Sequence, residues 1–351
     1  MVTTERQAFI DWMKAIGMFL IVTGHVVGSP HAMFNEVAQP IYTKQLGVAF
    51  FIFIMGWGLA RERGDWMPVL FKRLFPIYFY GIICALILSG IFWFTKGDIN
   101  ESNYLPFFAG INVFFNYFPA NPTTWYIGTY LHVLLVWALF LRGKSITPAL
   151  FGCAFVFEIV FRAALTYINK DFMAYMMLPN WLSVFLMGMW LSDKQDKEFG
   201  AGTLAIALLW LMGLLTWAWV GGGLSVGNEF PFRSLPGMES GVSVMVQSIV
   251  ISLVYIANTF LGFQLARRLF SSRLINFFSR NTILVFILHM PIIYAFSSYF
   301  YDVIGDHAYK RIMWVVFLFV ALSLFSELCE RIVNVKKVQL KVYSAVFGAR
   351  A

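Results

Sequence analysis

The sequence predicts an all-α fold: a polytopic bundle of about ten transmembrane helices, with both termini in the cytoplasm. Sixty per cent of the 351 residues are hydrophobic and 13% are charged, whereas a soluble domain has roughly 25% charged residues. The hydrophobic residues form runs of the length that a helix needs to cross a bilayer, about 20 mainly apolar residues. Lysines and arginines gather in short segments between these runs, as orientation signals do in membrane proteins.

Ten segments are apolar enough to be spans, although the second and the sixth are short. The stretch 104–119 is also apolar, but Pro106, Gly110 and Pro119 interrupt it. These residues favour a re-entrant or interfacial segment over a further span. The predicted spans are 8–28, 45–60, 75–95, 124–141, 146–168, 180–193, 201–221, 242–264, 281–300 and 311–330.

The distribution of basic residues predicts the orientation. If the N-terminus is cytoplasmic, eighteen lysines and arginines lie in the inner segments and six in the outer ones. This asymmetry is the positive-inside pattern, and it also favours an even number of spans. We therefore expect one transmembrane domain over residues 1–335, followed by a short basic cytoplasmic tail at 336–351. The expected location is the plasma (inner) membrane.

Other classes of function are disfavoured by the same composition. The net charge is +8, but its basic residues serve as orientation signals, so no nucleic acid partner is expected. Cys84, Cys153 and Cys329 are far apart in sequence, which excludes a CxxC metal or redox site. The five histidines form no HxxxH or HExxH pattern, so we expect no metal.

The first span carries three polar side chains on one face. Lys14 and His25 are eleven residues apart, which returns a helix to nearly the same direction, and Asp11 precedes Lys14 by three. A histidine can act as a general base near neutral pH. In the alternative interpretation, Lys14 extends to the membrane surface beside Asp11, and His25 bonds a neighbouring helix.

The second and third predicted spans carry small and basic residues. Gly56 and Gly58 would let another helix approach the second span closely. Pro76 is expected to begin the third span, with Lys72 and Arg73 at its inner entrance. Such a pair of cations can hold an anionic ligand or anchor the span at the membrane surface.

Further polar residues lie inside later spans, where ionisable groups are usually functional. Glu158 and Arg162 are four residues apart and can neutralise each other. A structural ion pair and a substrate-binding pair are equally compatible with this spacing. His132 shares a helix face with Trp125, and His289 lies in the ninth predicted span. Both histidines are more often helix–helix hydrogen-bond partners than catalytic groups.

The motifs of these spans, taken in order, resemble the membrane acyltransferase 3 family. The first-span segment DWMKAIGMFLIVTGH resembles its opening, in which a basic residue, ten residues and a histidine recur. AFFIFIMGWGLA and KRLFPIY resemble the family's second-span signature and its entry to the third span. TTWYIGTYL, NWLSVFLMGMWLS and SRNTILVFILHMPII resemble later landmarks. The similarity covers about residues 6–330, and the fucose 4-O-acetylase-like branch is the most similar group.

The resemblance implies O-acylation of a carbohydrate or a similar polyol. The donor would be a cytoplasmic acyl-CoA, most often acetyl-CoA, and no metal would take part. His25 would be the catalytic base, on the face that it shares with Lys14 and Asp11. The acyl-CoA-binding residues would be Arg73, Lys72, Arg63 and Arg280. The residues expected to meet the acceptor or to serve as structural polar groups are Glu158, Arg162, Trp125, His132 and His289.

A secondary transporter of a small polar or sugar-like solute is the main alternative. It too would have about ten helices and charges in the middle of the membrane. Transporters usually consist of related halves, but the Lys14 and His25 face has no counterpart in the second half. The sequence leaves open which sugar accepts the acyl group, and whether the chain forms a homo-oligomer.

Overall fold

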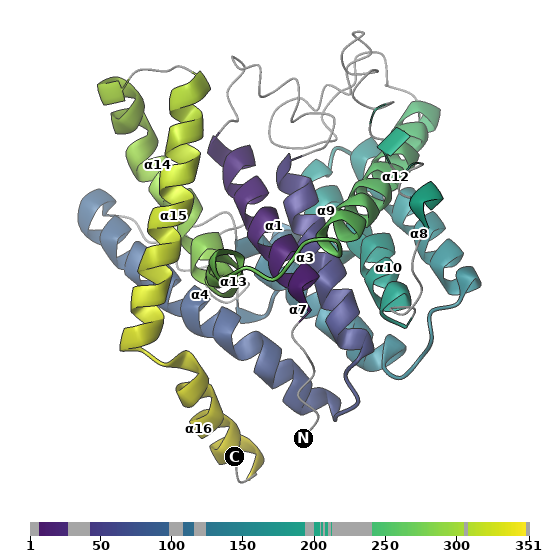
Figure 1. The fold of residues 1–351 in the computed structure, drawn as a ribbon, viewed down its shortest axis with the longest axis horizontal. Coiled ribbons are helices and arrows are strands. Elements are labelled where there is room, and N and C mark those ends of the chain that lie inside the picture. The colour runs from purple at the N-terminus through teal and green to yellow at the C-terminus, as the bar shows by residue number, and fades with distance from the viewer. Residues whose placement is uncertain are drawn as a thin grey trace.

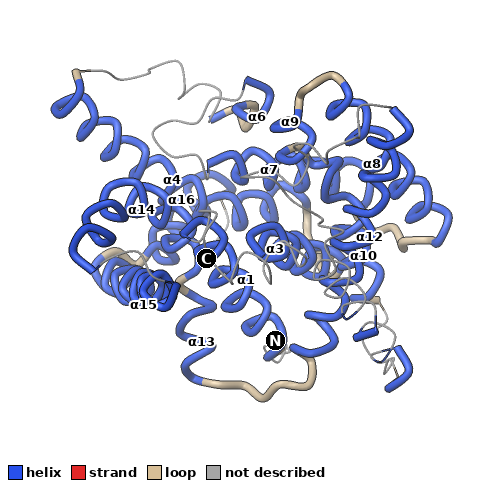
Figure 2. The backbone as a smooth tube through the Cα atoms, turned by 90° about the horizontal axis from the view of Figure 1, so that it is seen from above, coloured by secondary structure: helices blue, strands red, loops and turns tan. Residues whose placement is uncertain are grey.

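The structure is a computed structural model that describes residues 7–26, 43–97, 108–115, 124–193, 200–203, 205, 208–209, 212, 241–304 and 308–348. Every regular element in these ranges is helical (Figure 2). The elements are α1 (Ala8–Val26), α3 (Thr43–Ala60), α4 (Trp66–Lys96), α6 (Asn112–Phe115), α7 (Trp125–Val136), the π-helix η3 (Trp137–Leu141), α8 (Pro148–Tyr167), α9 (Asp171–Met176), the 3-10 helix η4 (Leu178–Trp181), α10 (Leu182–Ser192), α12 (Gly241–Ala266), α13 (Arg273–Arg280), α14 (Thr282–Ile304), α15 (Ala308–Ile332) and α16 (Val335–Phe347).

The centre of the bundle is formed by α1, α3 and α10, and glycines bring these helices together. A Cβ atom on Gly47 of α3 would lie 2.4 Å from the carbonyl oxygen of Gly17 of α1. A Cβ atom on Gly56 would lie 2.2 Å from the carbonyl oxygen of Phe185 of α10. The predicted close approach at Gly56 is therefore confirmed. Without glycine at these positions the backbones would have to move apart.

The segments predicted to be cytoplasmic meet at one end of the bundle. The Trp57 indole donates a hydrogen bond to Gln7 Oε1 (3.0 Å), which places the end of α3 beside the start of α1. The Ser279 hydroxyl of α13 donates to Asp11 Oδ1 of α1 (2.6 Å). In Figure 1, α1 starts near the middle of the view, beside α13, and the end of α3 and α16 lie lower.

The chain is a multi-pass membrane protein by the length and hydropathy of its helices. In the described part, five helices are long and apolar enough to span a bilayer, and α13 with α14 gives a sixth bent by 64°. Two shorter apolar helices, Gln45–Ala60 and Trp125–Leu141, coincide with the second and fourth predicted spans. Most of the predicted span 201–221 lies outside the described residues. The total of ten spans and the side of the termini stay predictions.

The predicted start of the third span is wrong. The helix α4 begins at Trp66, and Pro76 lies inside it rather than at its start. Proline has no N–H group, so the carbonyl four residues earlier, that of Lys72, loses its helical partner. Gln339 Nε2 of α16 donates to this carbonyl oxygen (2.7 Å). A side chain from the C-terminal helix thus supplies the missing bond, and α4 continues through the proline.

The segment predicted to be a basic tail forms α16, which packs against the first turns of α4. Asn334 caps the helix by accepting a hydrogen bond from the Lys337 backbone N–H (2.9 Å). The Phe71 ring of α4 lies 5.7 Å from the Tyr343 ring and 5.6 Å from the Phe347 ring. A helix in this segment was not predicted from the sequence.

Candidate active site

Two histidines from opposite ends of the sequence meet inside the bundle. His25 lies near the end of α1, and His289 lies in α14 with none of its surface exposed. His25 Nδ1 lies 3.0 Å from His289 Nε2, and the two ring centroids are 5.0 Å apart. The bond is the helix–helix hydrogen bond that was expected of His289 and, in the alternative interpretation, of His25. The sequence did not predict that the two histidines bond each other.

Aromatic side chains extend from the histidine pair toward the end of the bundle at which α3 ends. The Phe286 ring lies 6.0 Å from the His289 ring and 5.3 Å from the Tyr126 ring of α7. Tyr126 and Tyr130, one turn apart, have ring centroids 6.1 Å apart. Tyr130 forms a hydrogen bond with Arg73 of α4. A row of neighbouring side chains therefore joins Arg73 to the two histidines.

Asp11 and Lys14 lie at the other end of α1 from His25. At 1.5 Å rise per residue they are about 21 Å and about 16 Å from it along the helix axis. Asp11 is buried and accepts the hydrogen bond from Ser279, so it ties α1 to α13. Lys14 is half-buried. Neither side chain shares the immediate surroundings of the His25 imidazole.

Arg73 is held between three elements near the end of α3. Its Nη2 donates to Glu62 Oε1 (2.9 Å) in the segment between α3 and α4. The guanidinium also rests on Gly58, where a Cβ atom would lie 3.0 Å from Nη2. The Arg73 Nε is buried and has no hydrogen-bond partner among the described residues. An arginine fixed in this way, with an unused donor, is suited to meet an anionic ligand.

Two other cations predicted to hold acyl-CoA have partners of their own. The Lys72 ammonium lies over the Tyr343 ring of α16 (5.4 Å), so Lys72 and Arg73 point to different neighbours. Arg280 Nη2 forms an ion pair with Glu327 Oε2 of α15 (2.7 Å), and its side chain is 51% exposed. The structure thus brings neither of them to Arg73.

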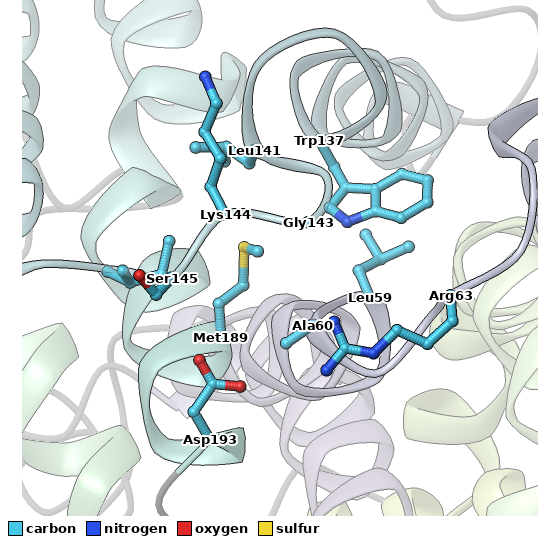
Figure 3. A pocket seen from close by; sticks show the side chains of 11 residues that line it. Leu59, Ala60, Arg63, Trp137, Leu141, Gly143, Lys144, Ser145, Met189 and Asp193 are labelled. Carbon is cyan, nitrogen blue, oxygen red and sulfur yellow. The ribbon is translucent and has the colours of Figure 1, made fainter.

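Arg63 lines a cavity of about 280 Å³ near the end of α3. The walls come from the end of α3, from η3 with the loop that follows it, and from the end of α10. In Figure 3 the Arg63 guanidinium and the Asp193 carboxylate turn toward the middle of the cavity, while the Lys144 ammonium points away. Sites for small molecules measure roughly 300–1,000 Å³, so this cavity has room for only part of a large ligand. Its lining residues are Leu59, Ala60, Arg63, Trp137, Leu141, Gly143, Lys144, Ser145, Ile146, Met189 and Asp193.

Glu158 and Arg162 form the expected ion pair, with Arg162 Nη2 2.6 Å from Glu158 Oε1. Both side chains are 1% exposed. Arg162 also donates to Asn180 and to the hydroxyl of Ser252, and Glu158 accepts from that hydroxyl and from the Ser183 backbone N–H. The network joins α8, η4, α10 and α12. Because protein groups already satisfy the pair, its surroundings favour a structural role over substrate binding.

Trp125 and His132 also lie in contacts between elements. The Trp125 ring is 5.2 Å from the Tyr175 ring of α9. His132 forms a hydrogen bond with the Gly110 backbone, and its ring is 5.8 Å from that of Phe114 in α6. These contacts attach the segment 108–115 to α7. In the part of the chain that the structure describes, no group of three or more His, Cys, Asp or Glu could hold a metal ion.

Tyr126 and Tyr130 were not among the candidate site residues predicted from the sequence. Their spacing of four residues on α7 was the available signal, because it places both hydroxyl-bearing rings on one helix face. That face could be related to His25 only after α7, α14 and α1 had been placed beside one another.

The comparison with protein families decides the class of this protein. A family model described as an acyltransferase domain matches residues 7–329. The chain belongs to this acyltransferase family. The match confirms the resemblance to acyltransferase 3 proteins across nearly the whole chain, and it includes every helix from α1 through most of α15. No curated protein and no solved structure matches the chain significantly.

Proposed function

We propose that this acyltransferase moves an acetyl group from acetyl-CoA to a hydroxyl of a carbohydrate, with His25 as the general base. The observation that carries the proposal is the His25 imidazole, held against His289 inside a bundle of membrane-spanning helices. Acyl transfer to a hydroxyl requires a group that takes the hydroxyl proton, and imidazole does so near neutral pH.

The reaction can be written around His25 alone. The acceptor O–H gives its proton to the imidazole while its oxygen attacks the thioester carbonyl carbon. The C–S bond then breaks, and the departing thiolate takes the proton from the imidazolium. The products are an O-acetyl ester and free CoA, and His25 returns to its neutral form.

The donor is proposed to enter from the inner end, where basic residues gather. Coenzyme A carries several negative charges, and Arg73 and Arg63 offer guanidinium groups to its phosphates. Arg63, which lines the cavity of about 280 Å³, would bind a phosphate there. The Tyr130 and Tyr126 face of α7 runs from Arg73 toward His25. We assign the pantetheine arm to this face, which lets the thioester reach His25 while the phosphates stay at Arg73.

The acceptor is proposed to approach from the opposite end, because His25 lies near the outer end of α1. Asp11 and Lys14 would then position α1 and attract the donor rather than touch the reacting atoms. Our proposal also includes ten spans, both termini in the cytoplasm, and the plasma (inner) membrane as the location. The acceptor would be a glycan or a lipid-linked sugar.

The test is transfer of labelled acetyl groups by the purified protein. The protein in lipid nanodiscs would be incubated with [14C]acetyl-CoA and a panel of oligosaccharides and lipid-linked sugars. We expect label in a sugar ester that mild alkali releases, and at least about 100-fold slower labelling with His25→Gln. No ester from any acceptor, together with uptake of labelled sugar into proteoliposomes, would instead establish the transporter alternative.

A further inference from the structure

The hydrogen bonds of His289 determine which of its nitrogens carries a proton. Its Nδ1 lies 2.7 Å from the Phe286 carbonyl oxygen and 3.1 Å from the Val285 carbonyl oxygen, both in its own helix. A carbonyl oxygen can only accept a hydrogen bond. His289 Nδ1 must therefore be the donor, and in the neutral ring Nε2 keeps its lone pair as an acceptor.

The same reasoning applies to His25. His289 Nε2 lies 3.0 Å from His25 Nδ1. Since His289 Nε2 accepts, His25 Nδ1 must donate, and the lone pair of the neutral His25 ring resides on Nε2. We infer that His289 is a positioning residue that holds His25 in its Nδ1–H tautomer, so that Nε2 is the base. This inference rests on the proposed function.

The tautomer matters because the other form of His25 would present a donor at Nε2. A neutral histidine side chain in water favours the Nε2–H tautomer, which cannot take a proton from a hydroxyl at that nitrogen. Serine proteases solve the same problem with a buried carboxylate on Nδ1. A carboxylate is costly inside a membrane, whereas a second imidazole whose own proton is fixed by backbone carbonyls can accept the bond without a charge.

Two substitutions of His289 distinguish its effect on the tautomer of His25 from its contribution to packing. His289→Gln places a carbonyl oxygen about where Nε2 lies, so His25 Nδ1 still has an acceptor. His289→Leu fills the space but offers none. Ser323→Ala is the matched control, because it removes a buried hydroxyl that donates to a carbonyl of its own helix, that of Phe319 (2.7 Å).

We expect kcat of His289→Leu to fall about 100-fold, within the range that general base catalysis contributes. His289→Gln should recover about tenfold of that loss if the acceptor atom is what matters. The KM for acetyl-CoA should stay within about twofold in both variants, because an interaction that acts on the base leaves donor binding intact. Ser323→Ala should keep the wild-type kcat.

The tautomer itself can be observed without any substrate. In protein labelled with [15N]histidine, the ring nitrogens of five residues are visible by solid-state NMR, and His25→Gln assigns the His25 signals. We expect a protonated Nδ1 and an unprotonated Nε2 on neutral His25 in the wild type and in His289→Gln. In His289→Leu the proton should move to Nε2.

A wild-type His25 with its proton on Nε2 would overturn the inference, as would a His289→Leu variant with unchanged kcat. Equal losses in the Leu and Gln variants, with the His25 tautomer unchanged in both, would make His289 a packing residue only. The proposed function fails by a different result: no acetyl transfer by the wild type, even though its His25 carries the proton on Nδ1.

Discussion

The Arg162 guanidinium lies 2.6 Å from the Glu158 carboxylate, and each of the two side chains is only 1% exposed. Removing one member would leave the other as an unpaired charge in the bundle interior, where water cannot solvate it. We therefore expect Arg162→Met to lower the free energy of unfolding by about 3–5 kcal/mol. Thermal unfolding in detergent, followed by the loss of monodisperse protein, would measure the change.

A pair with the same spacing at the surface provides the control. Arg331 Nε lies 3.4 Å from Glu327 Oε1, also at four residues, but the Arg331 side chain is 75% exposed. Arg331→Met should cost no more than about 1 kcal/mol, as exposed ion pairs do. Equal losses of stability in the two variants would contradict the structural importance of the buried network.

The helices were predictable because a bilayer imposes a length and a hydropathy that the sequence reveals directly. The exceptions include α4, which was predicted to begin near Pro76 but begins at Trp66, and α16, which forms where only a basic tail was predicted. Proline is expected at a helix start because, inside a helix, it leaves the carbonyl four residues earlier without a hydrogen-bond partner. Gln339, far along the chain, supplies that partner, and no local pattern could reveal it.

The candidate site was predictable only within each helix. Helical periodicity placed Asp11, Lys14 and His25 on one face, but it contains no information on which helix packs against that face. The bond between His25 and His289 joins residues 264 positions apart. Periodicity also gave no way to choose between a structural and a substrate-binding role for the pair at 158 and 162. The hydrogen bonds that join this pair to η4, α10 and α12 favour the structural role.

His25 is expected to be essential for turnover but not for folding. His25→Gln keeps a polar side chain of similar reach but removes the base, so kcat should fall by about 10²–10⁴-fold. Acetyl transfer would be measured alongside size-exclusion elution and the unfolding temperature. A correctly folded His25→Gln variant with near-normal turnover would remove His25 from the mechanism.

Lys14 should tolerate arginine better than alanine. We propose that its charge, at the inner end of α1, helps to attract the anionic donor, and arginine keeps that charge with a different geometry. Lys14→Ala should therefore lower kcat/KM for acetyl-CoA severely and Lys14→Arg mildly. Measuring both at two ionic strengths adds a check, because screening weakens attraction between exposed charges. Equal losses in both variants would favour a packing role.

The predicted topology can be tested with single cysteines at described, exposed positions. Lys170→Cys lies between α8 and α9, at the end of the bundle predicted to face outward, and Ser271→Cys lies between α12 and α13 at the opposite end. With Cys84, Cys153 and Cys329 replaced by alanine, an impermeant maleimide applied to intact cells should label only position 170. Position 271 should react only after the membrane is opened. The reverse pattern would overturn the orientation with cytoplasmic termini.

Arg73 and Glu62 should affect donor binding in opposite directions. Their ion pair of 2.9 Å occupies a guanidinium that we propose for a phosphate of CoA. Arg73→Ala should raise the KM for acetyl-CoA about tenfold or more and leave the KM for the acceptor unchanged, because a lost phosphate contact removes uniform binding. Glu62→Gln should lower the KM for acetyl-CoA, since the carboxylate no longer competes with the phosphate for Arg73.

The opposite signs make this pair of variants more informative than either one alone. If Arg73 only anchored α4 at the membrane surface, both substitutions would remove the same ion pair and would change stability in the same direction, with no change in the KM for either substrate. Lys72→Ala supplies a further comparison, because Lys72 is adjacent in sequence but lies over Tyr343 of α16. If Lys72→Ala raised the KM for acetyl-CoA as much as Arg73→Ala does, the donor would be attracted by the general positive charge of this end. A large effect of Arg73→Ala alone would instead support a direct contact between its guanidinium and the donor.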